Sequence, residues 1–132
     1  MTVPAEEGAG VNSHRQLAEV AAVLRQRING ALLDAGVWML DPSRVYLDAD
    51  VVVEPGARIH PDTYAEGSTH IAAGAEVGPS VRLVDSSVAT GARVQQAVCL
   101  SAVVGEGASV GPFAYLRPGA VIESGAKVGT YV

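Results

Sequence analysis

The chain has 132 residues, of which 48% are hydrophobic, and its nine basic and fourteen acidic residues give a net charge of −5. This is enough for one modest globular domain with an appendage, and the absence of a basic cluster argues against nucleic acid as a partner. The sequence does not open on a basic and then apolar signal segment, and no apolar run could span a bilayer. We therefore expect a cytoplasmic protein with no membrane partner.

The first third of the chain is predicted to form a loose tail over residues 1–11 and then a helical arm over residues 12–36. Ser13 followed by Gln16 fits a capping box, and Gly36 supplies a helix stop. Apolar residues recur at every fourth position on one stripe of the arm: Leu17, Ala21, Leu24, Ile28 and Leu32. A helix of roughly 22 residues spans about 33 Å, so the segment can act as a spacer whose apolar stripe needs a partner.

Residues 37–46 are predicted to form a loop that connects the arm to the next region. The Asp41-Pro42 step blocks a helix and starts a turn. We expect the indole of Trp38 to pack where the arm meets that region.

Residues 47–132 follow a six-residue period. An aliphatic residue leads each hexad, and a small or β-branched residue follows four positions later. The clearest leads are Val104, Val110, Leu116, Ile122 and Val128. A period of six does not fit the 3.6-residue repeat of a helix, and Gly or Pro occurs in nearly every hexad. Because three hexads make one coil of a triangular prism, the segment predicts a mainly β fold, a left-handed parallel β-helix of about five coils.

The period is interrupted in its middle part. One residue is missing from the hexad between Leu83 and Val88, and two are missing between Leu100 and Val104. A shift inside a strand would turn apolar side chains outward, so we expect irregular corners instead. These corners are predicted near residues 85–87 and 101–103. The single cysteine, Cys99, lies in this stretch; it excludes a disulfide within the chain, and we expect it to pack in the core.

Motifs in both halves of the chain resemble a known enzyme family. Gly111-Pro-Phe-Ala-Tyr-Leu-Arg-Pro-Gly119, followed by Gly129-Thr-Tyr-Val132, is similar to the acetyltransferase part of the bacterial bifunctional N-acetylglucosamine-1-phosphate uridyltransferase/glucosamine-1-phosphate N-acetyltransferase. Gly10-Val-Asn-Ser-His-Arg-Gln-Leu-Ala18 resembles the segment that closes the family's uridyltransferase domain, and the arm with Asp41-Pro42 after it resembles the family's connecting arm. The resemblance covers essentially all residues from Gly10 onward. It implies a fragment, namely the linker arm and the first coils of the acetyltransferase domain.

The resemblance implies roles for two residues. Arg117 matches the arginine that binds the sugar phosphate or nucleotide sugar at the acetyltransferase site, and a guanidinium suits a phosphate. Read without the motif, Arg117 is a solvated corner arginine like the others in the hexads. Asn12 matches the asparagine that contacts the nucleotide sugar and its Mg²⁺ in the uridyltransferase site, a role that requires the parent domain. Read alone, Asn12 is a residue at a helix N-terminus.

The family's other functional groups are not matched within this sequence. Its glycine-rich nucleotide loop falls before residue 1, and its second phosphate-binding lysine and its histidine base fall beyond Val132. The resemblance therefore implies no catalytic residue in this chain, and none of its three histidines matches the base: His14, His60 and His70. His60 and His70 are ten residues apart and do not stack at the coil spacing, which argues against a zinc site like that of hexapeptide-repeat carbonic anhydrases.

Two hypotheses of function follow. In the first, the chain is part of a homotrimeric transferase that makes UDP-N-acetylglucosamine for cell-wall precursors, using acetyl-CoA and glucosamine 1-phosphate and then UTP with Mg²⁺. The isolated chain is then expected to be inactive, because a histidine base is needed to take the proton of the attacking amine. In the second, the chain is a non-catalytic hexapeptide-repeat module for trimerisation or ligand binding.

Overall fold

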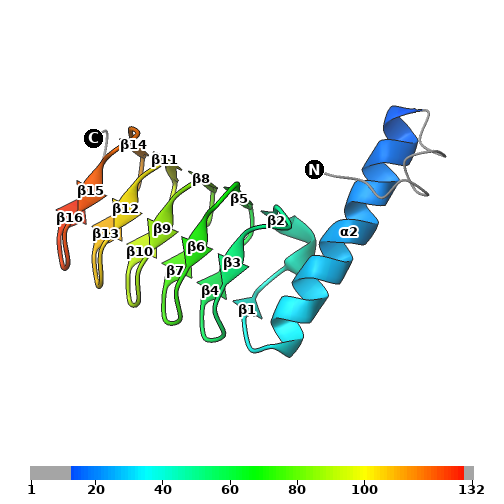
Figure 1. Cartoon of the computed structure of the whole chain (residues 1–132), viewed down its shortest axis with the longest axis horizontal. Coiled ribbons are helices and arrows are strands. Elements are labelled where there is room, and N and C mark those ends of the chain that lie inside the picture. The colour runs from blue at the N-terminus through cyan, green and yellow to red at the C-terminus, as the bar shows by residue number, and fades with distance from the viewer. Residues whose placement is uncertain (1–12, 130–132) are drawn as a thin grey trace.

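The structure, a computed structural model, describes residues 13–129. It consists of one long helix, α2 (His14–Asp34), and a left-handed parallel β-helix whose coils lie side by side along the long axis (Figure 1). A short 3-10 helix, η1 (Pro42–Arg44), lies in the first coil. No helix in the described part of the chain is long and apolar enough to cross a membrane.

Each coil passes through three short strands, one on each face of a triangular prism, and every strand pairs in parallel with those of the neighbouring coils. Face A contains β1 (Trp38–Met39), β4 (Arg58–Ile59), β7 (Glu76–Val77), β10 (Arg93–Val94), β13 (Ser109–Val110) and β16 (Lys127–Val128). Face B contains β2 (Val45–Leu47), β5 (Thr63–Glu66), β8 (Val81–Val84), β11 (Ala97–Leu100) and β14 (Ala114–Leu116). Face C contains β3 (Val52–Val53), β6 (His70–Ile71), β9 (Ser87–Val88), β12 (Val103–Val104) and β15 (Val121–Ile122). The predicted fold class and number of coils are confirmed.

The core is a narrow column of aliphatic side chains between the three faces. Because side chains alternate along a strand, the lead of each hexad points inward and the residue before it points outward. The parallel register then stacks each lead on the lead of the next coil. On face A these stacked and buried leads are Met39, Ile59, Val77, Val94 and Val110.

The interruptions of the period are absorbed at corners, as predicted, but at three corners rather than two. Cys99, not Leu100, is the inward residue of β11, because it pairs in register with Leu83 and with Leu116. One residue is therefore lost before Cys99 and one after it. The shortened corners contain Asp85, Gln96 and Ser101, whose φ angles are 49°, 43° and 45°. The prediction that Leu100 leads this hexad was wrong. Leu100 is more hydrophobic than Cys99 and fits the six-residue period, but the pairing between coils places Cys99 inside.

Cys99 is fully buried, as expected. Burial raises the pKa of its thiol to about 12. The cysteine is therefore a core side chain without a reactive thiolate at neutral pH.

Residues 37–46 differ from the predicted connecting loop, since they contain β1 and the start of β2. β1 pairs with β4 through Trp38 and Arg58, so the β-helix begins before residue 47. The indole of Trp38 is 38% exposed on the outside of face A, in the first coil. It lies 4.5 Å from the Arg58 guanidinium and edge-to-face against His60, with 5.3 Å between ring centroids.

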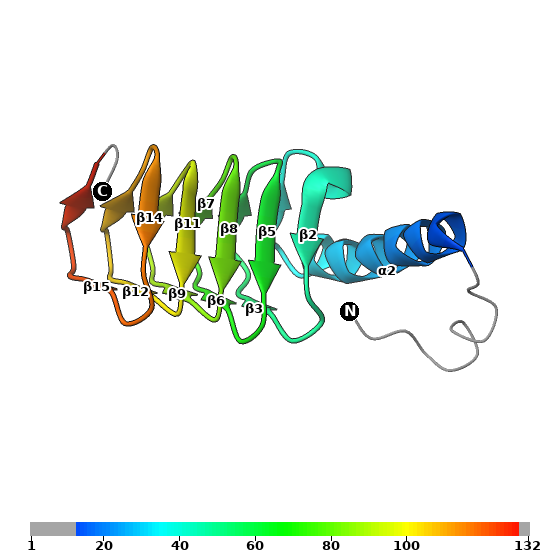
Figure 2. The same ribbon diagram turned by 90° about the horizontal axis from the view of Figure 1, so that it is seen from above.

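The helical arm, predicted over residues 12–36, contains α2 over His14–Asp34. The Ser13 hydroxyl accepts a hydrogen bond from the Gln16 amide at 3.2 Å, and Gly36 follows the helix with a φ of 107°. In the second half of α2, Ile28 and Leu32 pack against the core of the β-helix. The first half projects away from the β-helix (Figure 2), which leaves the predicted apolar stripe only partly covered.

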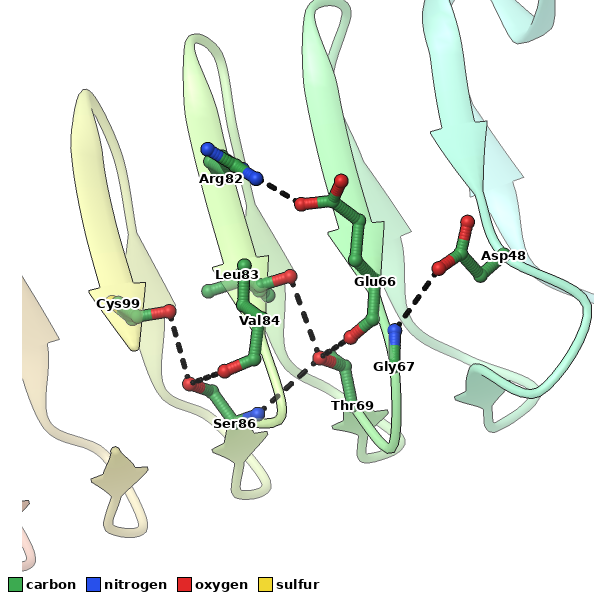
Figure 3. A network of polar contacts seen from close by, with 9 residues as sticks. All are labelled: Asp48, Glu66, Gly67, Thr69, Arg82, Leu83, Val84, Ser86 and Cys99. Atoms are coloured by element: carbon green, nitrogen blue, oxygen red, sulfur yellow. Dashed lines mark hydrogen bonds and ion pairs between the residues drawn. The ribbon is translucent and has the colours of Figure 1, made fainter. Parts of the chain in front are cut away.

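Buried hydroxyl groups hold the corners between faces B and C (Figure 3). The Thr69 hydroxyl donates to the Glu66 carbonyl at 2.7 Å. The Ser86 hydroxyl lies 3.0 Å from the Val84 carbonyl and 3.1 Å from the Cys99 carbonyl, and it accepts a hydrogen bond from the Ala102 amide. These bonds satisfy backbone groups that the irregular corner leaves out of the strand ladders.

Candidate functional site

Arg117 follows β14 at the corner between faces B and C of the fifth coil. The corner is fixed by two backbone hydrogen bonds, from the Ala120 amide to the Arg117 carbonyl and from the Gly119 amide to the Ser101 carbonyl, both 3.0 Å long. Gly119 has a φ of 89°, a conformation that favours glycine, and Pro118 restricts the backbone before it. The motif therefore forms a rigid corner from which an exposed Arg117 side chain extends.

Three other arginines of the hexads, Arg58, Arg82 and Arg93, are engaged with neighbouring side chains. The Arg58 guanidinium lies over the Trp38 ring, and Arg82 Nε lies 2.7 Å from a Glu66 oxygen (Figure 3). Arg93 Nε lies 3.7 Å from a Glu76 oxygen. Each of these side chains thus has a partner from a strand of the adjoining coil.

Arg117 differs from those arginines, because no carboxylate or aromatic ring within residues 13–129 pairs with it. In the preceding coil, the residue that corresponds to Arg117 is the aliphatic Leu100, because Leu116 pairs in register with Cys99. A guanidinium without an internal counter-charge keeps its donors for an external anion, and its planar fork matches a phosphate. The geometry leaves the Arg117 guanidinium accessible to an external anion.

The three histidines are not brought together or placed near Arg117. His14 is the first residue of α2, whereas His60 and His70 belong to the second coil. Because the strands of adjacent coils are about 4.8 Å apart, the second coil lies roughly 14 Å from the fifth along the axis. None of the three can therefore act on a group bound at Arg117.

Carboxylates pair with two of these histidines. His60 Nε2 lies 2.7 Å from Glu76 Oε1, and His70 Nε2 lies 2.5 Å from Glu54 Oε2. The hydrogen bond with His60 is the main cause that lowers the pKa of Glu76, and the charges of Arg93 and Arg58 add to it. These pairs join neighbouring coils of the β-helix. In the described ranges, no three His, Cys, Asp or Glu side chains come together as a metal site.

Asn12, the other residue that the resemblance singled out, lies outside the described residues. Its predicted contacts with a nucleotide sugar and Mg²⁺ are untested. Residues 13–129 contain no cluster of three His, Cys, Asp or Glu side chains that could serve as another Mg²⁺ site.

Two open grooves that the sequence analysis missed lie on face B. One, of about 570 Å³, lies between α2 and the start of face B and is lined by residues that include Arg25, Ile28, Tyr46, Asp50 and Tyr64. The other, of about 680 Å³, is lined by residues that include Asp62, Tyr64, Arg82, Val98 and Phe113. The rings of Tyr46 and Tyr64 stack with 4.6 Å between centroids. These tyrosines are 18 residues apart, which is the length of one coil, and this spacing was the sequence signal that could have predicted their stacking. Neither groove is lined by Arg117.

Comparison with known proteins confirms the resemblance inferred from the motifs. No family model matches the chain. The chain is 47% identical over 126 residues to the bifunctional protein GlmU of Streptomyces avermitilis, a match that covers 96% of this chain and 26% of the relative. The identity is 46% over 123 residues with the protein of the same name from Kineococcus radiotolerans, and 39% over 132 residues with that from Clostridium novyi. These two matches cover 93% and 100% of this chain. The chain thus spans about a quarter of the length of the curated relatives that it matches.

Proposed function

We propose, since the chain matches bifunctional GlmU proteins along nearly its whole length, that it provides the helical arm and the first acetyltransferase coils of such an enzyme. In this role it takes part in making UDP-N-acetylglucosamine for cell-wall precursors in the cytoplasm. The reaction acetylates glucosamine 1-phosphate with acetyl-CoA, and uridylyl transfer from UTP with Mg²⁺ follows in the other half of the enzyme.

Arg117 carries this proposal. Its side chain extends from a rigid corner, is exposed, and has no counter-charge within the described residues. We assign it to the phosphate of glucosamine 1-phosphate or of the nucleotide sugar, held by charge-assisted hydrogen bonds. Binding there would fix the anionic end of the sugar, so that its amine can be presented to the acetyl donor.

The base for acetyl transfer is not among His14, His60 and His70, because each lies on another element or coil. The chain's own share of the chemistry is therefore binding and positioning, not proton transfer. We further propose that the protein assembles as a homotrimer through faces of its prism. Within this assignment Asn12 would contact the nucleotide sugar and Mg²⁺ in the uridyltransferase half.

A binding experiment with residues 1–132 tests the assignment of Arg117. Glucosamine 1-phosphate is titrated into the wild-type chain and into Arg117→Ala, and affinity is measured by NMR chemical shifts. We expect Arg117→Ala to weaken binding at least tenfold, because a hydrogen bond to a charged group contributes about 1.5 to 3 kcal/mol.

Arg93→Ala is the matched control, since Arg93 is also exposed but pairs with Glu76. It should bind like the wild type. Equal affinities for wild type and Arg117→Ala would overturn the proposed site. Binding of the phosphate ligand without any role for Arg117 would favour the alternative of a non-catalytic ligand-binding module.

A further inference from the structure

Tyr115 lies two residues before Arg117 on the outer side of β14. The burial of this strand alternates, with Ala114 and Leu116 inside and Tyr115 outside. Side chains two residues apart on a strand project from the same face, about 6.6 Å apart along the chain. Arg117 directly follows β14 and, like Tyr115, is exposed. The two side chains therefore lie close together on the outside of the fifth coil.

Tyr115 differs from the other aromatic side chains that point outward from the strands. Tyr46 and Tyr64 stack on each other, and the Arg25 guanidinium lies 4.8 Å from the centre of the Tyr46 ring. Trp38 lies between Arg58 and His60. In contrast, within residues 13–129 Tyr115 has no hydrogen bond and no ring partner, and 51% of it is exposed.

The residue beside Tyr115 in register on β11 is Val98. An aliphatic neighbour supports one side of the tyrosine and offers its hydroxyl no partner. Within residues 13–129, the outside of the fifth coil thus combines an exposed aromatic ring and, two residues on, a cation without a counter-charge. Both groups are available to one ligand.

Together these observations match a ligand that has an anionic group next to a compact ring. A sugar phosphate has this form, because its phosphate carries the charge and the C–H groups of its ring form an apolar surface. Aromatic side chains combine a large apolar area with a polar tip, so a tyrosine can pack on such a ring while its hydroxyl stays in water. We propose that Tyr115 is a second binding residue beside Arg117 and packs on the hexose ring of the sugar phosphate. This inference rests on the proposed function of Arg117 and adds the recognition of the sugar ring to that of the phosphate.

The test compares two ligands that differ only in the ring. Inorganic phosphate and glucosamine 1-phosphate are each titrated into residues 1–132 and followed by NMR. In the wild type we expect tighter binding of glucosamine 1-phosphate. Tyr115→Ala should weaken the binding of glucosamine 1-phosphate at least fivefold, towards the affinity for inorganic phosphate, and leave the binding of inorganic phosphate unchanged. Tyr115→Phe should keep both affinities, because it keeps the ring.

Tyr64→Ala is the matched control, since Tyr64 points outward from face B three strands away, and it should change neither affinity. The proposal is overturned if Tyr115→Ala leaves the affinity for glucosamine 1-phosphate unchanged or lowers the affinities for both ligands equally. The Arg117→Ala variant distinguishes a failure of the proposed role of Tyr115 from a failure of the proposed function. If it abolishes binding of both ligands while Tyr115→Ala has no effect, only the role of Tyr115 fails. If it changes neither affinity, the proposed function itself fails.

Discussion

Thr69 and Ser86 show how single polar residues support an apolar core. Both are buried at corners between faces B and C, at positions equivalent to Ala102 in the next coil. A buried hydroxyl is costly unless it is bonded, and each of these bonds to backbone carbonyl groups (Figure 3). At these two corners, side-chain hydroxyls therefore bond to backbone groups that the strand ladders do not pair.

Ser86→Ala is predicted to destabilise the fold by about 1 to 3 kcal/mol, because the buried Ala102 amide loses its acceptor. The measurement is the free energy of unfolding in urea, followed by circular dichroism. Ser87→Ala is the control, since Ser87 is the adjacent serine, lies on the outward side of β9, and should be nearly neutral. Equal unfolding free energies for the two variants would show that the Ser86 hydroxyl does not stabilise the corner.

The helical arm is docked to the β-helix by one polar side chain and a few apolar contacts. Asn29 is the one buried residue of α2, and its Nδ2 donates to the carbonyls of Pro42 and Val45, at 2.8 Å in both cases. Its Oδ1 is buried and accepts no hydrogen bond from the described residues. These bonds fix the helix to the first coil at the point where the chain turns from η1 into β2.

Asn29→Ala is predicted to loosen this junction, because the Pro42 and Val45 carbonyls lose their donor while the rest of the β-helix keeps its ladders. Hydrogen exchange should show faster exchange of the α2 amides, with an opening free energy lower by about 2 kcal/mol. Amides of β7, β10 and β13 should be unaffected. Gln26→Ala, an exposed change on the same helix, should leave all rates as they are. Unchanged exchange in α2 of Asn29→Ala would mean that the apolar contacts alone hold the arm.

The three outer faces of the molecule differ in character. Face A presents mainly charged or polar side chains between Arg58 and Lys127. Face C presents Val52, His70, Ser87, Val103 and Val121, so the valines of its last two strands are neighbours, and Val121 is 66% exposed. Neighbouring exposed aliphatic residues are typical of surfaces that become covered. The proposed homotrimer is expected to bury face C rather than face A.

Sedimentation equilibrium of residues 1–132 is predicted to give a mass of about 40 kDa, three times the 13.5 kDa of one chain. Val103→Glu should reduce this mass, because it places a charge on face C. Ser109→Glu, the corresponding outward position on face A, should not change it. A mass of 13.5 kDa for the wild-type chain would contradict the homotrimer.

The amino-acid sequence by itself determined the arm, the prism and the number of coils. These follow from local rules, because a capping serine, a stop glycine and an inward residue at every sixth position each act within a few residues of the chain. It also singled out Arg117, but only through a resemblance, and nothing in the pattern separated this residue from Arg58 or Arg82.

Only the tertiary structure decided which residues face inward where the period breaks and which side chains have partners. Cys99 rather than Leu100 is inside, and Trp38 already belongs to the first coil, because pairing between coils, and not hydrophobicity alone, sets the register. The arginine partners lie 16 to 20 residues away in sequence, at distances that depend on the length of each coil. The absence of partners for Tyr115 and Arg117 within residues 13–129 could therefore be recognised only once the coils were stacked.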